Sequence, residues 1–259
     1  MRNKMLIFLG LMICLVFSGC GKKEVVDKAA LAPNVTENDT YEEETSMQEE
    51  TAVTEDEPAS AEDTVFPVEG FTYEEIENGV RITGYDEQYG SEVTVPSEID
   101  GNEVIAIGEK AFASSNEIVS ISIPDTVTVI EDYAFAWCES LEEVTLPEGL
   151  YSIGESAFLC DYELSDIVIP EGVTTIEAYT FSVCKDLKTI TIPDSVTTIG
   201  VQAFNECGSL GDVTLSANVT DIAEDAFIGC DNLALYTVLG SYADDYATEH
   251  VIFHIGTDN

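Results

Sequence analysis

Few residues of this chain have the types and spacing needed for catalysis. Ser182 and Lys185 form a Ser-x-x-Lys pair, in which a lysine one helical turn away can take the proton of a serine nucleophile. The pattern around them predicts a turn instead of a helix, and no Ser-Asp-Asn or Lys-Thr-Gly sequence follows. The two histidines, His250 and His254, lie close to the C-terminus, where we expect a cap surface and a strand face. The sequence therefore predicts that the protein is not an enzyme and has no catalytic residues.

The cysteines beyond the N-terminal region are better explained by packing than by metal binding. Cys138, Cys184, Cys207 and Cys230 recur three residues after a phenylalanine, and Cys160 lies one place early. They lack Cys-x-x-Cys spacing and nearby histidines, so no zinc site is expected. Equivalent cysteines of adjacent coils would point in parallel, which suits a disulfide poorly. We expect them to be small buried hydrophobic residues.

Acidic residues dominate the charge of the chain. There are 51 Asp and Glu against 9 Lys and Arg, giving a formal net charge of -42. Such a charge excludes binding of nucleic acid through basic patches. One regularly spaced set of carboxylates follows the predicted strands: Asp125, Glu148, Glu171 and Asp194. It lacks the spacing of a calcium loop, so no cofactor is expected, and only weak, non-specific Ca²⁺ binding is left open.

The elements that carry these residues repeat with a period of 23. The clearest set is the phenylalanines Phe112, Phe135, Phe158, Phe181, Phe204 and Phe227. Sets of isoleucine, proline and leucine keep the same step. A fixed period of this length predicts a solenoid, in which each coil buries its apolar face only against its neighbours.

One repeat shows how a coil is built. Ile190 and Ile192 alternate with Thr191, the pattern of a short strand with one buried face. Pro193 cannot donate to the ladder and ends the strand, and Phe204 fills the centre of the coil. Strands of successive coils then form a parallel sheet, about 4.8 Å apart.

The side chains that alternate with the buried ones form the candidate ligand face. They are Ser120, Ser122, Glu143, Thr145, Asp166, Val168, Thr189, Thr191, Asp212 and Thr214. This set is polar and lacks the Trp, Tyr and Arg anchors typical of tight interfaces. Two interpretations stay open: a solvated face that binds nothing in particular, and a shallow platform for a basic protein or a glycan.

Five segments are predicted along the chain. Residues 1–19 form a signal peptide with Arg2 and Lys4 before an apolar run, and residues 20–64 form an acidic disordered tether. Residues 65–95 form an N-terminal β cap with a hairpin at Asn78-Gly79, and residues 96–239 hold the 23-residue repeats. Residues 240–259 form a C-terminal cap, with a helix capped by Ser241 and a strand at residues 251–255.

Two resemblances follow from these patterns. Phe17-Ser18-Gly19-Cys20 resembles the lipobox of bacterial lipoproteins, which implies lipidation of Cys20 and a membrane anchor on the extracellular face. Segments such as IPDSVTTIGVQAFNECGSL resemble the BspA-like leucine-rich repeats of bacterial surface proteins. That resemblance implies an α/β-type repeat solenoid, a right-handed coil with a parallel sheet on its concave side, short strands and turns on its convex side, and a small α/β C-terminal cap.

The resemblance also implies a role on the cell surface. The favoured hypothesis is a lipid-anchored monomer that adheres to a host or neighbouring-cell protein or glycan without catalysis. The alternative is a structural envelope component with no defined ligand.

Overall fold

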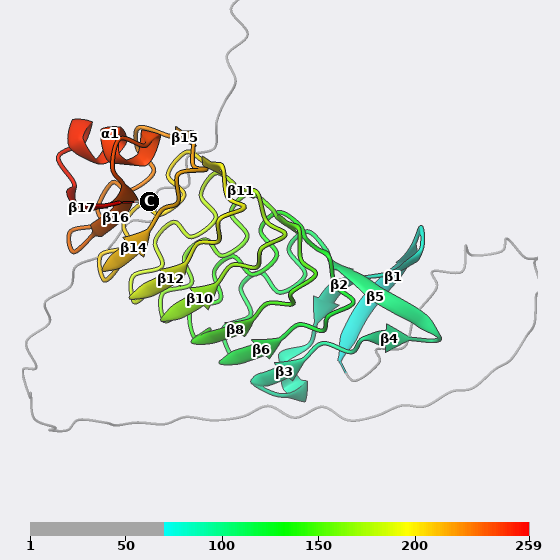
Figure 1. The fold of residues 1–259 in the computed structure, drawn as a ribbon. Helices are drawn as coiled ribbons and strands as arrows, with labels where there is room; N and C mark the ends of the chain where they lie inside the picture. The colour runs from blue at the N-terminus through cyan, green and yellow to red at the C-terminus, as the bar shows by residue number, and fades with distance from the viewer. Residues whose placement is uncertain (1–69, 259) are drawn as a thin grey trace, which may run out of the picture. The chain divides into compact units, whose positions relative to one another are not determined.

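The computed structural model describes residues 70–258 (Figure 1). The predicted signal peptide, Cys20, the predicted tether and the first residues of the predicted N-terminal cap lie outside this range. The described residues form a stack of coils in which equivalent strands lie side by side, with the helix α1 (Tyr242–Glu249) at the C-terminal end. The solenoid predicted from the period of 23 is confirmed.

One side of the stack carries a strand of three residues per coil. In each strand the middle residue is buried and its neighbours are exposed or half-buried, as the alternation predicted. Several neighbouring strands pair in parallel and in register, so that Ser120 lies beside Glu143 and Asp166 beside Thr189. These strands are β3 (Glu92–Thr94), β6 (Ser120–Ser122), β8 (Glu143–Thr145), β10 (Asp166–Val168), β12 (Thr189–Thr191) and β14 (Asp212–Thr214).

A second set of strands, two residues each, follows the three-residue strand of each coil; a proline lies between the two strands in every coil but the last, which has Ser216 there. The second residue of each two-residue strand is a buried isoleucine. Most of these strands also pair in parallel and in register with the equivalent strand of the next coil. They are β7 (Val129–Ile130), β9 (Ser152–Ile153), β11 (Thr175–Ile176), β13 (Thr198–Ile199) and β15 (Asp221–Ile222).

The third side of each coil is a turn that is also bonded to its neighbour. The backbone N–H of Phe135 donates to the carbonyl of Ala157 at 2.8 Å, and that of Phe158 to the carbonyl of Thr180 at 2.9 Å. Each turn places residues with positive φ at repeating positions, for example Tyr133 at 57°. Backbone hydrogen bonds between coils thus occur on all three sides and hold residues in a conformation that non-glycine residues seldom adopt.

The core is a ladder of aromatic rings along the stack. Neighbouring rings from Phe112 to Phe227 stack with centroids 5.1–5.5 Å apart. Phe158, in the middle, is fully buried. At the N-terminal end of the described stack the ladder ends at Tyr85, and at the C-terminal end it ends at Tyr246; both rings are tilted against their neighbours.

The N-terminal end of the stack is built from two hairpins. The strands β1 (Phe71–Ile76) and β2 (Gly79–Tyr85) pair in antiparallel fashion, with Asn78 at positive φ in the turn between them. A short 3₁₀ helix, η1 (Glu87–Tyr89), leads to β3. The strands β4 (Glu98–Ile99) and β5 (Asn102–Ile107) then form the second hairpin. This second hairpin explains why the prolines Pro96 and Pro124 are 28 residues apart and not 23.

The C-terminal end departs in detail from the expected cap. Ser241 caps α1 by accepting the N–H of Asp244, and the buried residues of α1 are Ala243, Tyr246 and Ala247. Tyr242, the first residue of the helix, is exposed.

The last strand also lies two residues later than predicted. It is β17 (Phe253–Thr257), which pairs in parallel with β16 (Ala234–Val238). Val251 has a φ of 59°, so residues 251 and 252 form the turn between α1 and the strand.

The cysteines are buried as expected, except Cys230, which is half-buried, and one position of their series holds a carboxyl. The thiols of Cys138, Cys184, Cys207 and Cys230 each lie 3.0–3.1 Å from the carbonyl of a phenylalanine 26 residues earlier. Asp161 occupies the equivalent position in the remaining coil and is fully buried. Burial raises the pKa of Asp161 well above its usual range.

Candidate functional site

Two rows of side chains run across the exposed face of the three-residue strands, and we call them together the polar strip. The first row is Glu92, Ser120, Glu143, Asp166, Thr189 and Asp212. The second row is Thr94, Ser122, Thr145, Val168, Thr191 and Thr214. Where the strands pair in parallel, each member lies beside its equivalent in the next coil, with the strands about 4.8 Å apart. The strands β8 and β10, and β12 and β14, are adjacent without such a ladder.

All ten residues of the predicted ligand face lie on this strip. Nine are exposed and Ser120 is half-buried, while the alternating residues between them are buried. The sequence-based prediction missed Glu92 and Thr94, because the second hairpin displaces β3 from the 23-residue period. The alternation of Glu92-Val93-Thr94 with a buried central valine is the signal that would have found them.

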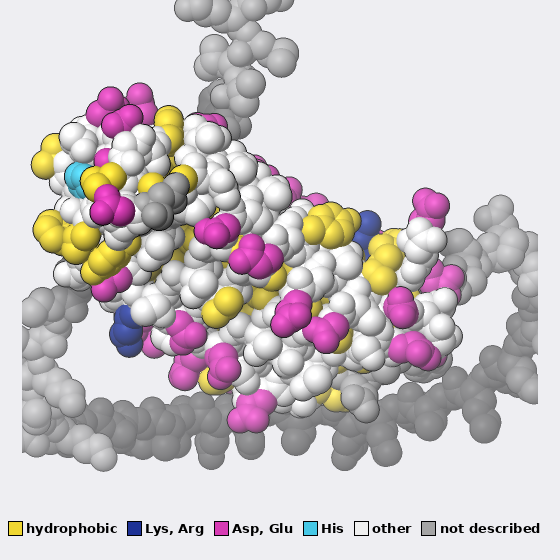
Figure 2. Space-filling model, viewed as in Figure 1, with side chains coloured by type: hydrophobic (Ala, Val, Ile, Leu, Met, Phe, Trp, Pro, Cys, Tyr) yellow, Lys and Arg dark blue, Asp and Glu magenta, His cyan; other side chains and the backbone are white. Residues whose placement is uncertain are grey.

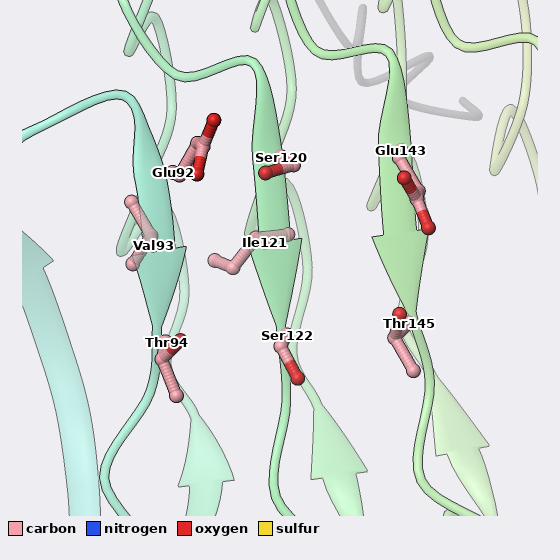
Figure 3. A pocket seen from close by; sticks show the side chains of 8 residues that line it. All are labelled: Glu92, Val93, Thr94, Ser120, Ile121, Ser122, Glu143 and Thr145. Atoms are coloured by element: carbon pink, nitrogen blue, oxygen red, sulfur yellow. The ribbon is translucent and has the colours of Figure 1, made fainter.

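The N-terminal half of the strip encloses a shallow hollow (Figure 3). Its volume is about 220 Å³, and it is lined by β3, β6 and β8. Figure 3 shows Glu92 and Glu143 on the outer two strands with Ser120 between them, and the hydroxyl side chains of Thr94, Ser122 and Thr145 below. Two carboxylates and four hydroxyls thus surround one open space.

The carboxylates of the strip have no cationic partner within residues 70–258. The ion pairs in this part of the chain join Arg81 to Glu74 and Glu131, Lys110 to Glu109, and His254 to Asp244. Lys185 lies with its ammonium 4.7 Å from the centre of the Tyr162 ring. Glu143 and Asp166 occupy adjacent strands, where their like charges repel, and a cation placed between them would relieve that repulsion.

The strip does not end at β14. The register continues through β16 into β17, so Asp212 aligns with Ala234 and Phe253, and Thr214 with Tyr236 and Ile255. We call Tyr236, Phe253 and Ile255 the apolar end. The interpretation that this face is poor in exposed aromatic residues was therefore incomplete. Helix α1 separates β16 from β17 and hides the alignment from any search with a fixed period.

The other candidate residues are not brought together. Ser182 is buried and accepts a hydrogen bond from the Asn205 amide, whereas Lys185 is exposed and turned to Tyr162. His250 lies against the carbonyl of Tyr246. Within the described range, no group of three or more His, Cys, Asp or Glu is placed to hold a metal ion. The carboxylates Asp125, Glu148, Glu171 and Asp194 are exposed.

A family model agrees with the repeat architecture. The model for the BspA type leucine rich repeat region matches residues 105–234 in six copies. The chain belongs to this family. Proteins with this repeat fold are typically non-catalytic, and leucine-rich repeat proteins generally bind other proteins. No curated protein matches the chain.

Solved bacterial leucine-rich repeat structures are similar to this BspA-type protein. A T. pallidum leucine-rich repeat protein is 27% identical with a TM-score of 0.58, over 74% of this chain and 99% of that one. A protein from Bacteroides ovatus is 27% identical with a TM-score of 0.52, over 67% of this chain and 55% of that one. A leucine-rich cell surface protein from Faecalibacterium prausnitzii is 30% identical with a TM-score of 0.50, over 65% and 53%. The chain therefore spans about half the length of the last two.

BspA-type proteins are bacterial surface proteins. In the part of this chain that the structure covers, no helix has the length and hydropathy of a membrane span.

Proposed function

We propose that this protein is a surface lipoprotein, anchored through Cys20, whose polar strip binds a cationic protein without catalysis. The stack is then a right-handed coil with the strip on its concave side, and the acidic segment 20–64 is the tether that holds it away from the membrane. One observation carries the proposal. Glu92, Glu143, Asp166 and Asp212 lie in one exposed row and have no ion-pair partner in the described residues.

Charge favours a protein partner over the alternatives. A face lined by unpaired carboxylates attracts Lys and Arg side chains and speeds their approach. The hydroxyls between the carboxylates can accept and donate hydrogen bonds to the partner backbone. Nucleic acid and anionic lipid would be repelled by the same field. A neutral glycan would use the hydroxyls but would gain little from the charge.

Reversing the charges of the strip is expected to weaken binding at least tenfold. The variant Glu143→Lys, Asp166→Lys, Asp212→Lys replaces three attractive charges by repulsive ones at the proposed contact. The full chain, purified in a non-ionic detergent, would be titrated with extracellular-matrix proteins, basic surface proteins and envelope glycans. Raising the salt concentration should weaken binding of the wild-type chain as well.

The matched control is Asp125→Lys, Glu148→Lys, Glu171→Lys, which changes the net charge equally away from the strip. Equal loss in both variants would mean that net charge and not the strip controls binding. Tight, salt-independent binding of a glycan would mean that the ligand is a sugar and not a protein. No saturable binding across the panel would favour a structural envelope component.

Lipidation has a separate test. In cells fed an alkyne-labelled fatty acid, the wild-type chain should incorporate the label and sediment with membranes, whereas Cys20→Ala should do neither. A labelled Cys20→Ala chain would contradict lipidation at this residue, and Cys14→Ala is the matched control.

A further inference from the structure

We propose that the apolar end of the strip anchors an extended, cationic segment of the partner, which adds as a strand to the open edge of β17. The inference rests on the proposed function, since the rest of the partner would lie over the polar strip. To the proposed function this inference adds the position of the strongest contact, the extended shape of the bound segment, and the positive charge of its side chains.

The apolar end supplies side chains that the polar strip lacks. Phe253 is 66% exposed and Ile255 is 41% exposed, and both belong to the face that carries Asp212 and Thr214. Tyr236 lies beside Ile255 and is half-buried. Figure 2 shows hydrophobic side chains gathered over this end of the stack. Partly exposed aromatic and branched side chains on a rigid sheet are typical of the residues that dominate binding energy.

The edge of β17 is open for strand addition. Among residues 70–258, β17 pairs with β16 alone. It is five residues long, pairs without a bulge, and contains no Lys or Pro, so it lacks the devices that usually protect an edge strand. By contrast, β3 at the other end of the strip has three residues and carries Glu92. An extended segment can pair with β17 through its backbone and place alternate side chains beside Phe253 and Ile255.

Charge selects the occupant. No Lys or Arg follows Lys188 in the sequence, so the coils next to β17 carry carboxylates without a compensating cation. Asp245 and Glu249 are exposed on α1, which packs against β17, and Asp258 is exposed just after β17. A second copy of this chain would bring the same negative charge and be repelled. A segment in which Lys or Arg alternates with apolar residues matches both the charge and the pattern of the edge.

The test uses a labelled nine-residue peptide in which lysine alternates with valine around a central phenylalanine. Its binding to the full chain in non-ionic detergent would be followed by fluorescence anisotropy. We expect the double variant Phe253→Ala, Ile255→Ala to weaken binding roughly 10- to 30-fold. Tyr151→Ala is the matched control, since Tyr151 is 58% exposed and lies off the strip, and it should leave binding unchanged. Because all three side chains are exposed, the variants should melt at the wild-type temperature.

Three altered peptides test the mode of binding. Two carry methyl groups on the odd or on the even backbone nitrogens, and the one whose methylated nitrogens face β17 should lose binding, because it lacks the donors of the added strand. In the third, replacing lysine by glutamate should abolish binding through repulsion. Binding that survives in both methylated peptides would overturn strand addition. Concentration-dependent dimers of the wild-type chain that disappear in the double variant would overturn the choice of occupant in favour of a second copy.

The anchor and the proposed function fail in different ways. Peptide binding that is lost in the strip variant with three lysines but kept in Phe253→Ala, Ile255→Ala would overturn the anchor and leave the strip. Peptide binding lost only in the double variant would support the anchor and count against the strip. Binding unchanged in both variants would overturn both.

Discussion

Replacing Phe158 by alanine is expected to lower the free energy of unfolding by about 3–5 kcal/mol. Phe158 is fully buried, and its ring stacks on Phe135 at 5.1 Å and on Phe181 at 5.4 Å, nearly parallel to both. Truncation removes two ring contacts and leaves a cavity in the middle of the ladder. The backbone cannot close that cavity, because hydrogen bonds to the neighbouring coils hold it on three sides.

The loss would be measured by urea unfolding of the wild-type and Phe158→Ala chains. Tyr151→Ala serves as control, since an exposed tyrosine outside any cluster should change stability by less than about 0.5 kcal/mol. A loss below about 1 kcal/mol for Phe158→Ala would show that the coils can slide together. The stack would then be softer than the ring geometry implies.

Changing Asp161 to asparagine is expected to stabilise the protein at neutral pH, by on the order of 2 kcal/mol. Asp161 is completely buried, and one carboxyl oxygen accepts the N–H of Cys138 at 2.9 Å. Its other oxygen, Oδ2, has no hydrogen-bond partner in the described residues. An asparagine of the same shape can still accept from Cys138, carries no charge to desolvate, and has an N–H in place of Oδ2. The cysteines at the equivalent positions likewise carry a donor there.

The pH dependence follows from the raised pKa of Asp161, which burial causes. In the unfolded chain this carboxyl ionises near its ordinary pKa of 3.8, whereas in the folded protein it holds its proton to higher pH. Below about pH 4 the carboxyl of Asp161 is protonated in both the folded and the unfolded chain, so it does not oppose folding. As the pH rises from there through the folded pKa, the unfolded chain releases this proton while the folded protein keeps it, so the stability of the fold falls.

The difference in unfolding free energy between Asp161→Asn and the wild type should thus grow with pH. Urea unfolding at a series of pH values would measure it. Asp186→Asn, at an exposed position, is the control and should show no such growth. A difference that stays constant with pH would mean that Asp161 has the same pKa in the folded and unfolded chains.

The repeats were predictable from the sequence because each coil solves the same packing problem. The period of 23 and the alternation around Ile190 and Ile192 predicted the buried face; the structure confirms the period and the burial of Ile190, while Ile192 is half-buried. The face of Glu143 and Asp166 followed from the same alternation. A pattern that recurs in every coil leaves little freedom for tertiary contacts to change it.

The ends were harder to predict because nothing repeats there. The second hairpin moved Glu92 out of period, and α1 separates Phe253 from the strand that it extends. The choice between Cys160 and Asp161 for the core position depended on turn geometry: Cys160 has a φ of 64° and takes the turn position, so Asp161 faces inward. The sequence pattern therefore failed to reveal two residues proposed to bind the partner, Glu92 and Phe253.

The constant 23-residue register has a consequence for how such a protein can change over generations. Because each coil contacts only its neighbours, a duplicated coil has the same length as the original and packs against coils of the same kind on either side. Gain or loss of one repeat would lengthen or shorten the binding face by two side chains and leave both ends intact. Each duplication of a repeat would then change the length and the charge of the binding face by one coil, while the proposed anchor on β17 stays the same.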